Sequence, residues 1–244
     1  MNKIINNISV DCVIFGYADD SLYVMLTRRA LMDAKTGQPL FTDYTVQGHH
    51  ILIGENVDDA ARRVLKEKTG LDNIYLKQFH AFGDISRIQH TNDQLWLKTT
   101  YPDVSDYVLT VGYYSLVDKT KVNPDEAHSF SSWFPVAELP ELGYDHRNII
   151  AKALEALQSA VLKEPVAFEL LPEKFTLLQV QLLYEAILGV SFDRRNFRKK
   201  INQMKYVIPL DEKQNGVPHT PAQYYIFSWD VYHKTKKEKY NISF

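Results

Sequence analysis

Residues 48–71 read GHHILIGENVDDAARRVLKEKTGL, and this stretch decides how the first part of the chain folds. Its second part has apolar residues at positions 57, 60, 61, 64 and 65, which is the spacing of one buried helical face. Gly70 follows, at the place where a glycine ends a helix in the left-handed conformation. The pattern therefore predicts a helix over Val57–Thr69.

Strand patterns flank this helix on both sides. Val10–Gly16 and Leu22–Thr27 are rich in β-branched and aromatic residues around a polar break, which predicts a hairpin. Ile85–Asp106 is polar and contains Pro102, so we expect an extended hairpin or a loop there. The other elements expected in this half are strands and one long helix: strands Ile74–Gly83, Tyr107–Val117 and Ser132–Pro135, and the helix His146–Leu162. The mixture predicts an α+β domain.

The pattern changes after a short joint bracketed by Pro165 and Pro172. Beyond it, helical patterns come first and a single hairpin comes last. A boundary in this joint divides the chain into residues 1–164 and 165–244. At 244 residues, the chain has room for two domains of ordinary size.

The C-terminal part reads as two helices followed by a hairpin. A helix is expected over Thr176–Leu188, with Gly189 ending it, and a second helix over Asp193–Met204. Tyr206–Pro209 and Tyr224–Trp229 follow as strands that can pair. Two helices joined by a short turn, with a hairpin behind them, predict a winged helix-turn-helix.

The second of these helices has the composition of a DNA recognition helix. Phe197, Ile201 and Met204 recur at i, i+4 and i+7 and form its core stripe. Arginine can bridge the O6 and N7 acceptors of guanine, asparagine can pair with adenine, and lysine can neutralise phosphates. The candidate DNA-binding residues are Arg194, Arg195, Asn196, Arg198, Lys199 and Asn202.

The distribution of charge supports the same interpretation. The formal net charge of -2 hides an uneven division: residues 1–169 hold 16 Lys and Arg against 23 Asp and Glu, whereas residues 170–244 hold 12 against 7. A basic helix face alone is more often a solvated surface than a binding site. Here the basic excess, the tight helix spacing and the hairpin agree, so we expect the C-terminal half to bind double-stranded DNA.

The stretch quoted first resembles the Nudix box, G-x5-E-x7-R-E-U-x-E-E-x-G-U, in which U is aliphatic. His49 stands where the box begins with glycine, and Val64 and Lys68 stand where the box has two of its glutamates. The positions that agree with the box are Glu55, Arg63, Leu65, Glu67, Gly70 and Leu71.

These departures have a chemical meaning. Positions 64, 67 and 68 share one helical face, and the resemblance implies that three carboxylates there hold magnesium against a diphosphate in active Nudix enzymes. Val64 cannot ligate and Lys68 repels a cation. We therefore expect no Nudix hydrolysis and no bound metal or cofactor. The degenerate box remains as scaffold: Glu55 is expected to pair with Arg63, with Glu67 in a similar role.

A Nudix-like domain followed by a winged helix resembles the NrtR family of Nudix-related transcriptional regulators over nearly the whole chain. The resemblance implies an N-terminal Nudix-like α/β/α sandwich and a homodimer that binds a DNA operator and releases it when a small molecule occupies the sandwich. It is carried by Val57-Asp58-Asp59-Ala60-Ala61, Tyr113–Leu116, Tyr144-Asp145-His146, Leu171–Leu177, Leu183–Gly189 and Asp193–Lys200.

The effector is the most open part of this expectation. The eroded box resembles that of a Bacteroidetes branch that regulates sugar utilisation (AraR- and XylR-like), which favours a pentose such as L-arabinose or xylose. The alternative is ADP-ribose, the effector implied for regulators of NAD metabolism. The residues expected to face the old substrate cleft, and so to bind the effector, are Asp11, Arg29, Gln47, His49, Asp84, Asp145 and His146.

Two further functions stay open at this point. One is a pyrophosphohydrolase that uses Glu67 with another carboxylate, and the other is a module that binds RNA or protein. No apolar run approaches the ~18–20 residues that cross a bilayer, and no signal peptide is recognisable. With the single cysteine Cys12, which has no partner for an internal disulfide, this favours a cytoplasmic protein without membrane contact.

Overall fold

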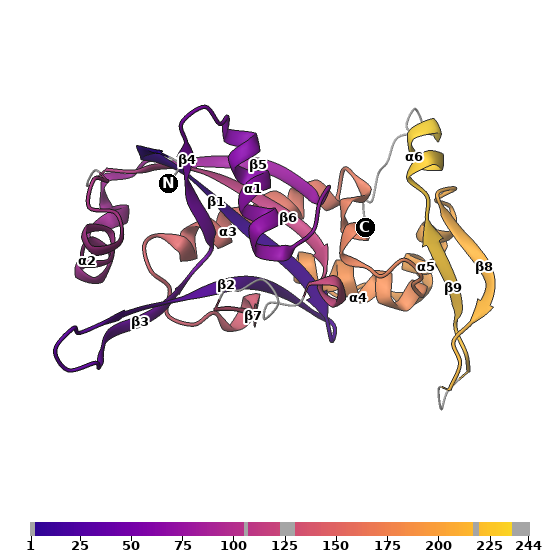
Figure 1. Cartoon of the computed structure of the whole chain (residues 1–244). Helices are drawn as coiled ribbons and strands as arrows, with labels where there is room; N and C mark the ends of the chain where they lie inside the picture. Colours follow the sequence, from indigo (N-terminus) through magenta and orange to yellow (C-terminus); the bar gives the residue numbers. More distant parts are fainter. Residues whose placement is uncertain (1–2, 105–106, 123–129, 217–219, 236–244) are drawn as a thin grey trace.

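The computed structural model describes residues 3–104, 107–122, 130–216 and 220–235 (Figure 1). Within these ranges a mixed β-sheet with helices on both faces is followed by short helices and a two-stranded hairpin. The fold is therefore α+β, as expected. None of the helices in these ranges combines the length and the apolar character that a bilayer crossing requires.

The sheet is built around the long first strand. β1 pairs in parallel with β6 and antiparallel with β2 and β4. Along the main path the order is β3-β2-β1-β6-β5, with β7 paired to β2. The strands in the described ranges are β1 (Ile4–Ala18), β2 (Ser21–Met32), β3 (Pro39–Thr45), β4 (Gln47–Leu52), β5 (Tyr75–Phe82), β6 (Leu109–Asp118) and β7 (Ser131–Pro135). The predicted strands are confirmed, and β3 and β4 are added to them.

Two helices cover the two faces of the sheet. β1 alternates, so that Val13 and Phe15 face one core while Cys12 and Ile14 face the other. Helix α3 (His146–Val161) packs into the first core and α1 (Val57–Thr69) into the second. The prediction for α1 is confirmed at both ends: Asn56 caps its start, and Gly70 ends it with φ of 71°.

The segment predicted as an extended hairpin or loop is largely helical, so that prediction was wrong. It forms a 3₁₀ turn, η1 (Ile85–Ile88), and then α2 (Thr91–Thr100); residues 105–106 at its end lie outside the described residues. Helix α2 buries a carboxylate, Asp93, and has no apolar stripe. The partner of Asp93 is Arg29, which is distant in sequence. A pattern search for apolar periodicity misses a helix that is held in this way.

The C-terminal half is the predicted winged helix-turn-helix. Helix α4 (Leu177–Leu188) starts with a capping box at Thr176 and ends at Gly189, which has φ of 68°. Helix α5 (Arg194–Asn202) is capped by Asp193. The hairpin β8 (Val207–Lys213) and β9 (Gln223–Phe227) forms the wing, and Trp229 begins α6 (Trp229–Thr235) instead of extending the strand. The remaining 3₁₀ turns are η2 (Lys119–Lys121), η3 (Val136–Glu138) and η4 (Pro165–Leu170).

One hydrophobic core joins the sheet to the winged helix. It continues from Phe15 in β1 through Leu157 in α3 and Leu183 in α4 to Phe197 in α5. A hydrogen bond from Gln158 Nε2 to the Ile187 carbonyl, 2.9 Å long, also ties α3 to α4. The two halves therefore share apolar packing, although α2 and the wing lie at opposite ends of the molecule (Figure 1).

Candidate ligand pocket and nucleic-acid interface

A cavity of about 330 Å³ opens on the sheet at the end of the molecule that carries α2. Strands β1, β2, β3 and β4 supply its floor, α1 supplies one wall, and η1, α2 and the start of α3 close the other sides. Its volume falls within the ~300–1,000 Å³ of typical small-molecule pockets. The box helix α1 faces this cavity, so the cavity lies on the side where the sequence predicts the effector to bind.

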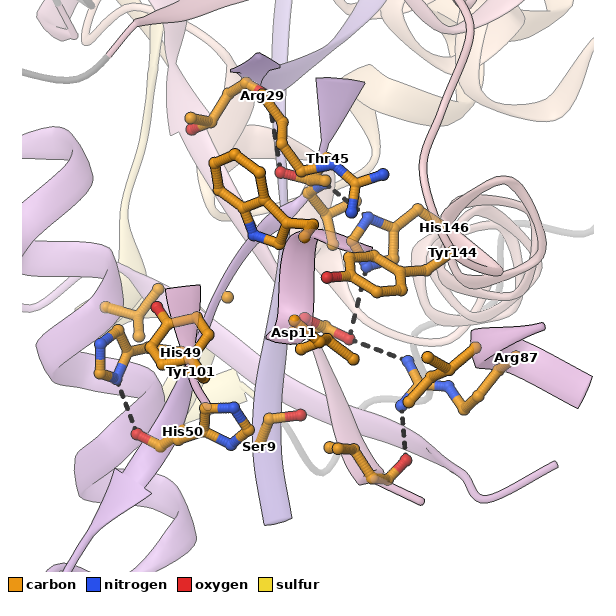
Figure 2. Close-up of a pocket in the computed structure, with 18 of the residues that line it drawn as sticks. Ser9, Asp11, Arg29, Thr45, His49, His50, Arg87, Tyr101, Tyr144 and His146 are labelled. Atoms are coloured by element: carbon orange, nitrogen blue, oxygen red, sulfur yellow. Dashed lines mark hydrogen bonds and ion pairs between the residues drawn. The ribbon is translucent and has the colours of Figure 1, made fainter. Parts of the chain in front are cut away.

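A buried cluster of charges lies in the middle of this pocket (Figure 2). Arg87 Nη2 lies 3.0 Å from Asp145 Oδ1 and 3.4 Å from Asp11 Oδ2. Burial raises the pKa of the Asp11 carboxyl, and the positive charge of Arg87 opposes that rise. Arg87 Nη1 also donates to the Val108 carbonyl at 2.8 Å. These contacts fix the guanidinium in place.

His146 is neutral and held in one tautomer. The Val46 backbone N–H donates to His146 Nδ1 at 3.1 Å, so the ring carries its proton on Nε2, which lies 3.8 Å from Asp11 Oδ2. Burial lowers the pKa of His146 from 6.5 to about 3. The ring therefore presents an uncharged N–H to the carboxylate and to the pocket.

A second cluster surrounds Arg29 at the far side of the pocket (Figure 2). Its guanidinium donates to Asp43 at 2.7 and 2.6 Å and to Asp93 of α2 at 2.6 Å. The ring of Tyr144 lies 4.6 Å from its Cζ atom. Among the described residues, no acceptor bonds the buried Nη1 atom of Arg29.

Aromatic rings form the third side of the pocket. The Tyr101 ring lies 5.2 Å from His50 and 6.3 Å from His49, measured between ring centroids. Trp96 of α2 also lines the pocket and packs edge-on against Phe41. Rings of this kind can cover a planar base or the apolar face of a sugar.

The box helix presents three side chains to the cavity. Val64, Glu67 and Lys68 all line it, as their helical spacing predicts. The predicted pairing of the box scaffold is confirmed: Arg63 donates twice to Glu55, at 2.8 and 2.9 Å.

A Nudix box implies magnesium, but these residues do not fit that ion. Glu67 lies 3.5 Å from Arg63, Val64 offers no ligating atom, and Lys68 is a cation. In the part of the chain that the structure describes, no group of three or more His, Cys, Asp or Glu side chains is placed to hold a metal ion. The donor set lacks the oxygen ligands that a hard divalent cation requires.

The residues predicted for the effector site separate into three groups. Asp145 reaches the pocket through Arg87, whereas Gln47 is bonded to Thr27 beneath the surface and Asp84 is exposed as the cap of η1. Gln47 Nε2 donates to the Met25 carbonyl and Asp84 accepts from the Ser86 N–H, so both side chains stabilise the backbone, and neither lines the cavity. The predicted residues that line it are Asp11, Arg29, His49 and His146.

Several pocket residues escaped the sequence analysis. Arg87, Trp96 and Tyr101 fall in the segment that was predicted as a loop. The sequence did contain a signal for these pocket residues, namely a cation and two large aromatic residues within an otherwise polar segment. Gly48 was missed as well: a Cβ atom at this position would collide with the Asp11 carboxylate. Glycine there allows β4 to approach that side chain.

The candidate DNA interface is the outer face of α5. Phe197 and Ile201 are buried beneath it. The turn that sets the angle between α4 and α5 is fixed by Glu185, which accepts from the Phe192 N–H at 2.7 Å, and by Gln181 Nε2, which donates to the Phe192 carbonyl at 3.0 Å. The six predicted DNA-binding residues are all exposed: Arg194, Arg195, Asn196, Arg198, Lys199 and Asn202.

Comparison with known proteins gives independent evidence for both halves. The model of the NUDIX domain matches residues 6–153, and the model of the NrtR DNA-binding winged helix domain matches residues 167–227. The chain is 26% identical over 230 residues to the ADPR responsive transcriptional repressor NtrR of Acinetobacter baylyi, an alignment that covers 92% of this chain and 83% of that protein.

Solved structures agree with these matches. Shewanella oneidensis NrtR in complex with a 27mer DNA superposes with a TM-score of 0.72 at 26% identity, covering 92% of this chain and 94% of that one. A second structure of Shewanella oneidensis NrtR superposes with a TM-score of 0.70 at 25% identity, covering 97% of this chain and 98% of that one. The chain is a Nudix-family protein and belongs to the NrtR family of Nudix-related transcriptional regulators.

Proposed function

We propose that this chain is a transcriptional repressor that binds a DNA operator through α5 and releases it when ADP-ribose occupies the Nudix pocket. The observation that carries the proposal is the joining of a basic winged helix to a ligand pocket through one continuous hydrophobic core. The box has also lost two of the three carboxylates that it has in a hydrolase. A binding function therefore fits the pocket better than turnover.

The DNA-binding part of the proposal rests on free, exposed cations. Asp193 caps α5 through the Asn196 N–H at 2.8 Å, which orients the first turn of the helix. The side chains available to base edges and phosphates follow on its outer face. As a homodimer, the protein would place two such helices on half-sites about 34 Å apart, or a multiple of that spacing. Shewanella oneidensis NrtR, which has the same architecture, has been solved in complex with a 27mer DNA, and this supports DNA binding by the present chain.

The effector part favours ADP-ribose over the pentose expected from the eroded box. The relative from Acinetobacter baylyi is an ADPR responsive transcriptional repressor. The chemistry of the pocket also suits the charged molecule. Trp96 and Tyr101 line it and can cover an adenine base, and the cations Arg28 and Lys68 line it and can meet phosphate oxygens.

Helix α3 provides a physical connection between the two sites. Its first residue, His146, lines the pocket, and Asp145 before it pairs with Arg87. Farther along, Leu157 and Gln158 contact the α4 side of the shared core. A ligand that prefers a different position of α3 would thus shift α4 and α5, and a shift of the recognition helices lowers DNA affinity.

The test begins by letting the full-length protein select its own duplexes from a random-sequence library. Binding of a selected duplex is then followed by fluorescence anisotropy with added ADP-ribose, L-arabinose, xylose or no ligand. We expect ADP-ribose to weaken DNA binding and the pentoses to leave it unchanged. Release by a pentose would restore the sugar interpretation.

Two other results would overturn the proposal as a whole. One is failure to select any duplex while an RNA library is enriched. The other is rapid magnesium-dependent hydrolysis of ADP-ribose that the Glu67→Gln variant abolishes, which would make the protein an enzyme.

A further inference from the structure

We propose that the Lys68 ammonium occupies the role that magnesium has in Nudix enzymes, so that the pocket binds the diphosphate of its effector without any divalent cation. This inference rests on the proposed function, because it concerns how the same pocket recognises ADP-ribose. It assigns a specific ligand contact to a residue that departs from the box.

The position of Lys68 is the first support. Lys68 lies one turn beyond Val64 on the wall of α1 that faces the cavity, and its side chain is half-buried there. Val64 is 1% exposed and contributes only apolar surface. Glu67 forms an ion pair with Arg63, in which Glu67 Oε1 lies 3.5 Å from Arg63 Nη1. Of the three former ligand positions, position 68 is thus the one with a charged group free to meet a ligand.

The charge balance of the pocket is the second support. Arg29 and Arg87 each lie against two carboxylates, so their charges are compensated within the protein. For Lys68, the described part of the chain places no carboxylate within ion-pair distance, and the same holds for the exposed Arg28 at the cavity. A neutral sugar would leave this charge uncompensated, whereas a diphosphate would compensate it.

The chemistry of the ammonium completes the case. It has three N–H donors on a flexible stem and forms charge-assisted hydrogen bonds to phosphate oxygens. Its charge also opposes the approach of a divalent cation to the same place. Affinity should therefore depend on ionic strength and be independent of magnesium.

The experiment is isothermal titration of the full-length protein with ADP-ribose, once in EDTA and once in excess magnesium chloride. For the wild type we expect the two dissociation constants to agree within about twofold. The Lys68→Met variant should bind about tenfold or more weakly, because it loses charge-assisted hydrogen bonds. Lys66→Met is the matched control, because Lys66 lies on the same helix, is exposed and pairs with Asp72. The affinity of the Lys66→Met variant for ADP-ribose should equal that of the wild type.

Inorganic pyrophosphate is titrated in parallel, because it probes the diphosphate site without the nucleoside. Pyrophosphate binding that Lys68→Met abolishes, together with no binding of ADP-ribose, would support the Lys68 assignment and overturn the proposed effector. Wild-type binding of ADP-ribose that requires magnesium, or that is equal in Lys68→Met, would overturn the Lys68 assignment and leave the effector intact. Thermal melting of each variant shows that the fold is retained.

Discussion

The buried arginine side chains of the pocket are paired with carboxylates, whereas the cations on the outer face of α5 are exposed to solvent. Arg29 is 3% exposed and is fixed by carboxylates on two other elements, Asp43 and Asp93. Arg195 and Lys199 extend from one short helix into solvent. The buried charges depend on their partners because a bare charge is costly away from water. The exposed ones need no partner inside the protein and are free to meet a polyanion.

The largest expected effect comes from breaking the buried cluster. Arg29→Met leaves the carboxylates of Asp43 and Asp93 without their cation, and we expect the free energy of unfolding to fall by about 3–5 kcal/mol. Urea titration measures it. The control is Arg62→Met, whose pair with Asp59 is exposed (66% and 56%), so the loss there should stay below about 1 kcal/mol. Equal losses in the two variants would contradict the distinction between buried and exposed charges.

The next effect concerns the exposed charges. Arg195→Ala combined with Lys199→Ala should weaken binding of a selected duplex by about a hundredfold, while thermal melting stays unchanged. DNA affinity decreases as the salt concentration rises. The slope of log affinity against log salt should become less negative by about 2 if both side chains contact phosphates. Lys35→Ala, an exposed cation in the β2–β3 turn, serves as the control. Unchanged DNA binding in the double variant would remove α5 from the interface.

A smaller effect is expected from pH. Because the pKa of His146 is about 3 when folded and 6.5 when unfolded, the unfolded chain takes up a proton first as the pH falls. Below pH 6.5 this residue therefore lowers stability by up to about 1.4 kcal/mol per pH unit. His146→Asn keeps an acceptor for the Val46 N–H but cannot be protonated, so its stability should fall less steeply with acid.

Urea titrations of the two proteins between about pH 7 and pH 4.5 measure this slope. The raised pKa of Asp11 acts in the opposite direction, since it favours the folded state at lower pH, and comparison with His146→Asn separates the two contributions. The exposed His80 provides the control: His80→Asn should leave the wild-type slope unchanged. A slope that His146→Asn does not alter would show that the imidazole is protonated in the folded state.

The smallest effect tests how the two regions communicate. Gln158→Leu removes the hydrogen bond to the Ile187 carbonyl while keeping apolar contact with α4. We expect the ratio of DNA affinities without and with ADP-ribose to shrink by about two- to fivefold, because DNA affinity in the presence of ADP-ribose rises while the affinity without ligand is nearly retained. Lys152→Ala, on the exposed side of the same helix, should not change the ratio. An unaltered ratio for Gln158→Leu would place the coupling outside this contact.

Local signals were enough for much of the chain. The apolar spacing and Gly70 determined α1, and Thr176, Gly189 and Asp193 determined the limits of α4 and α5. These features act within a few residues of themselves through helix periodicity, capping and the left-handed conformation of glycine. The sequence by itself also determined that two carboxylates of the Nudix box are missing and that the C-terminal half is basic.

Only the tertiary structure decided how the pocket is closed. Helix α2 is held by Asp93, whose partner Arg29 lies 64 positions earlier in the chain, and Arg87 joins Asp11 to Asp145 across similar separations. No local pattern reports such pairs, because burial of a charge becomes favourable only when a distant segment brings its counter-charge. For the same reason Gln47 and Asp84 could not be told from pocket residues until the strands were assembled around them.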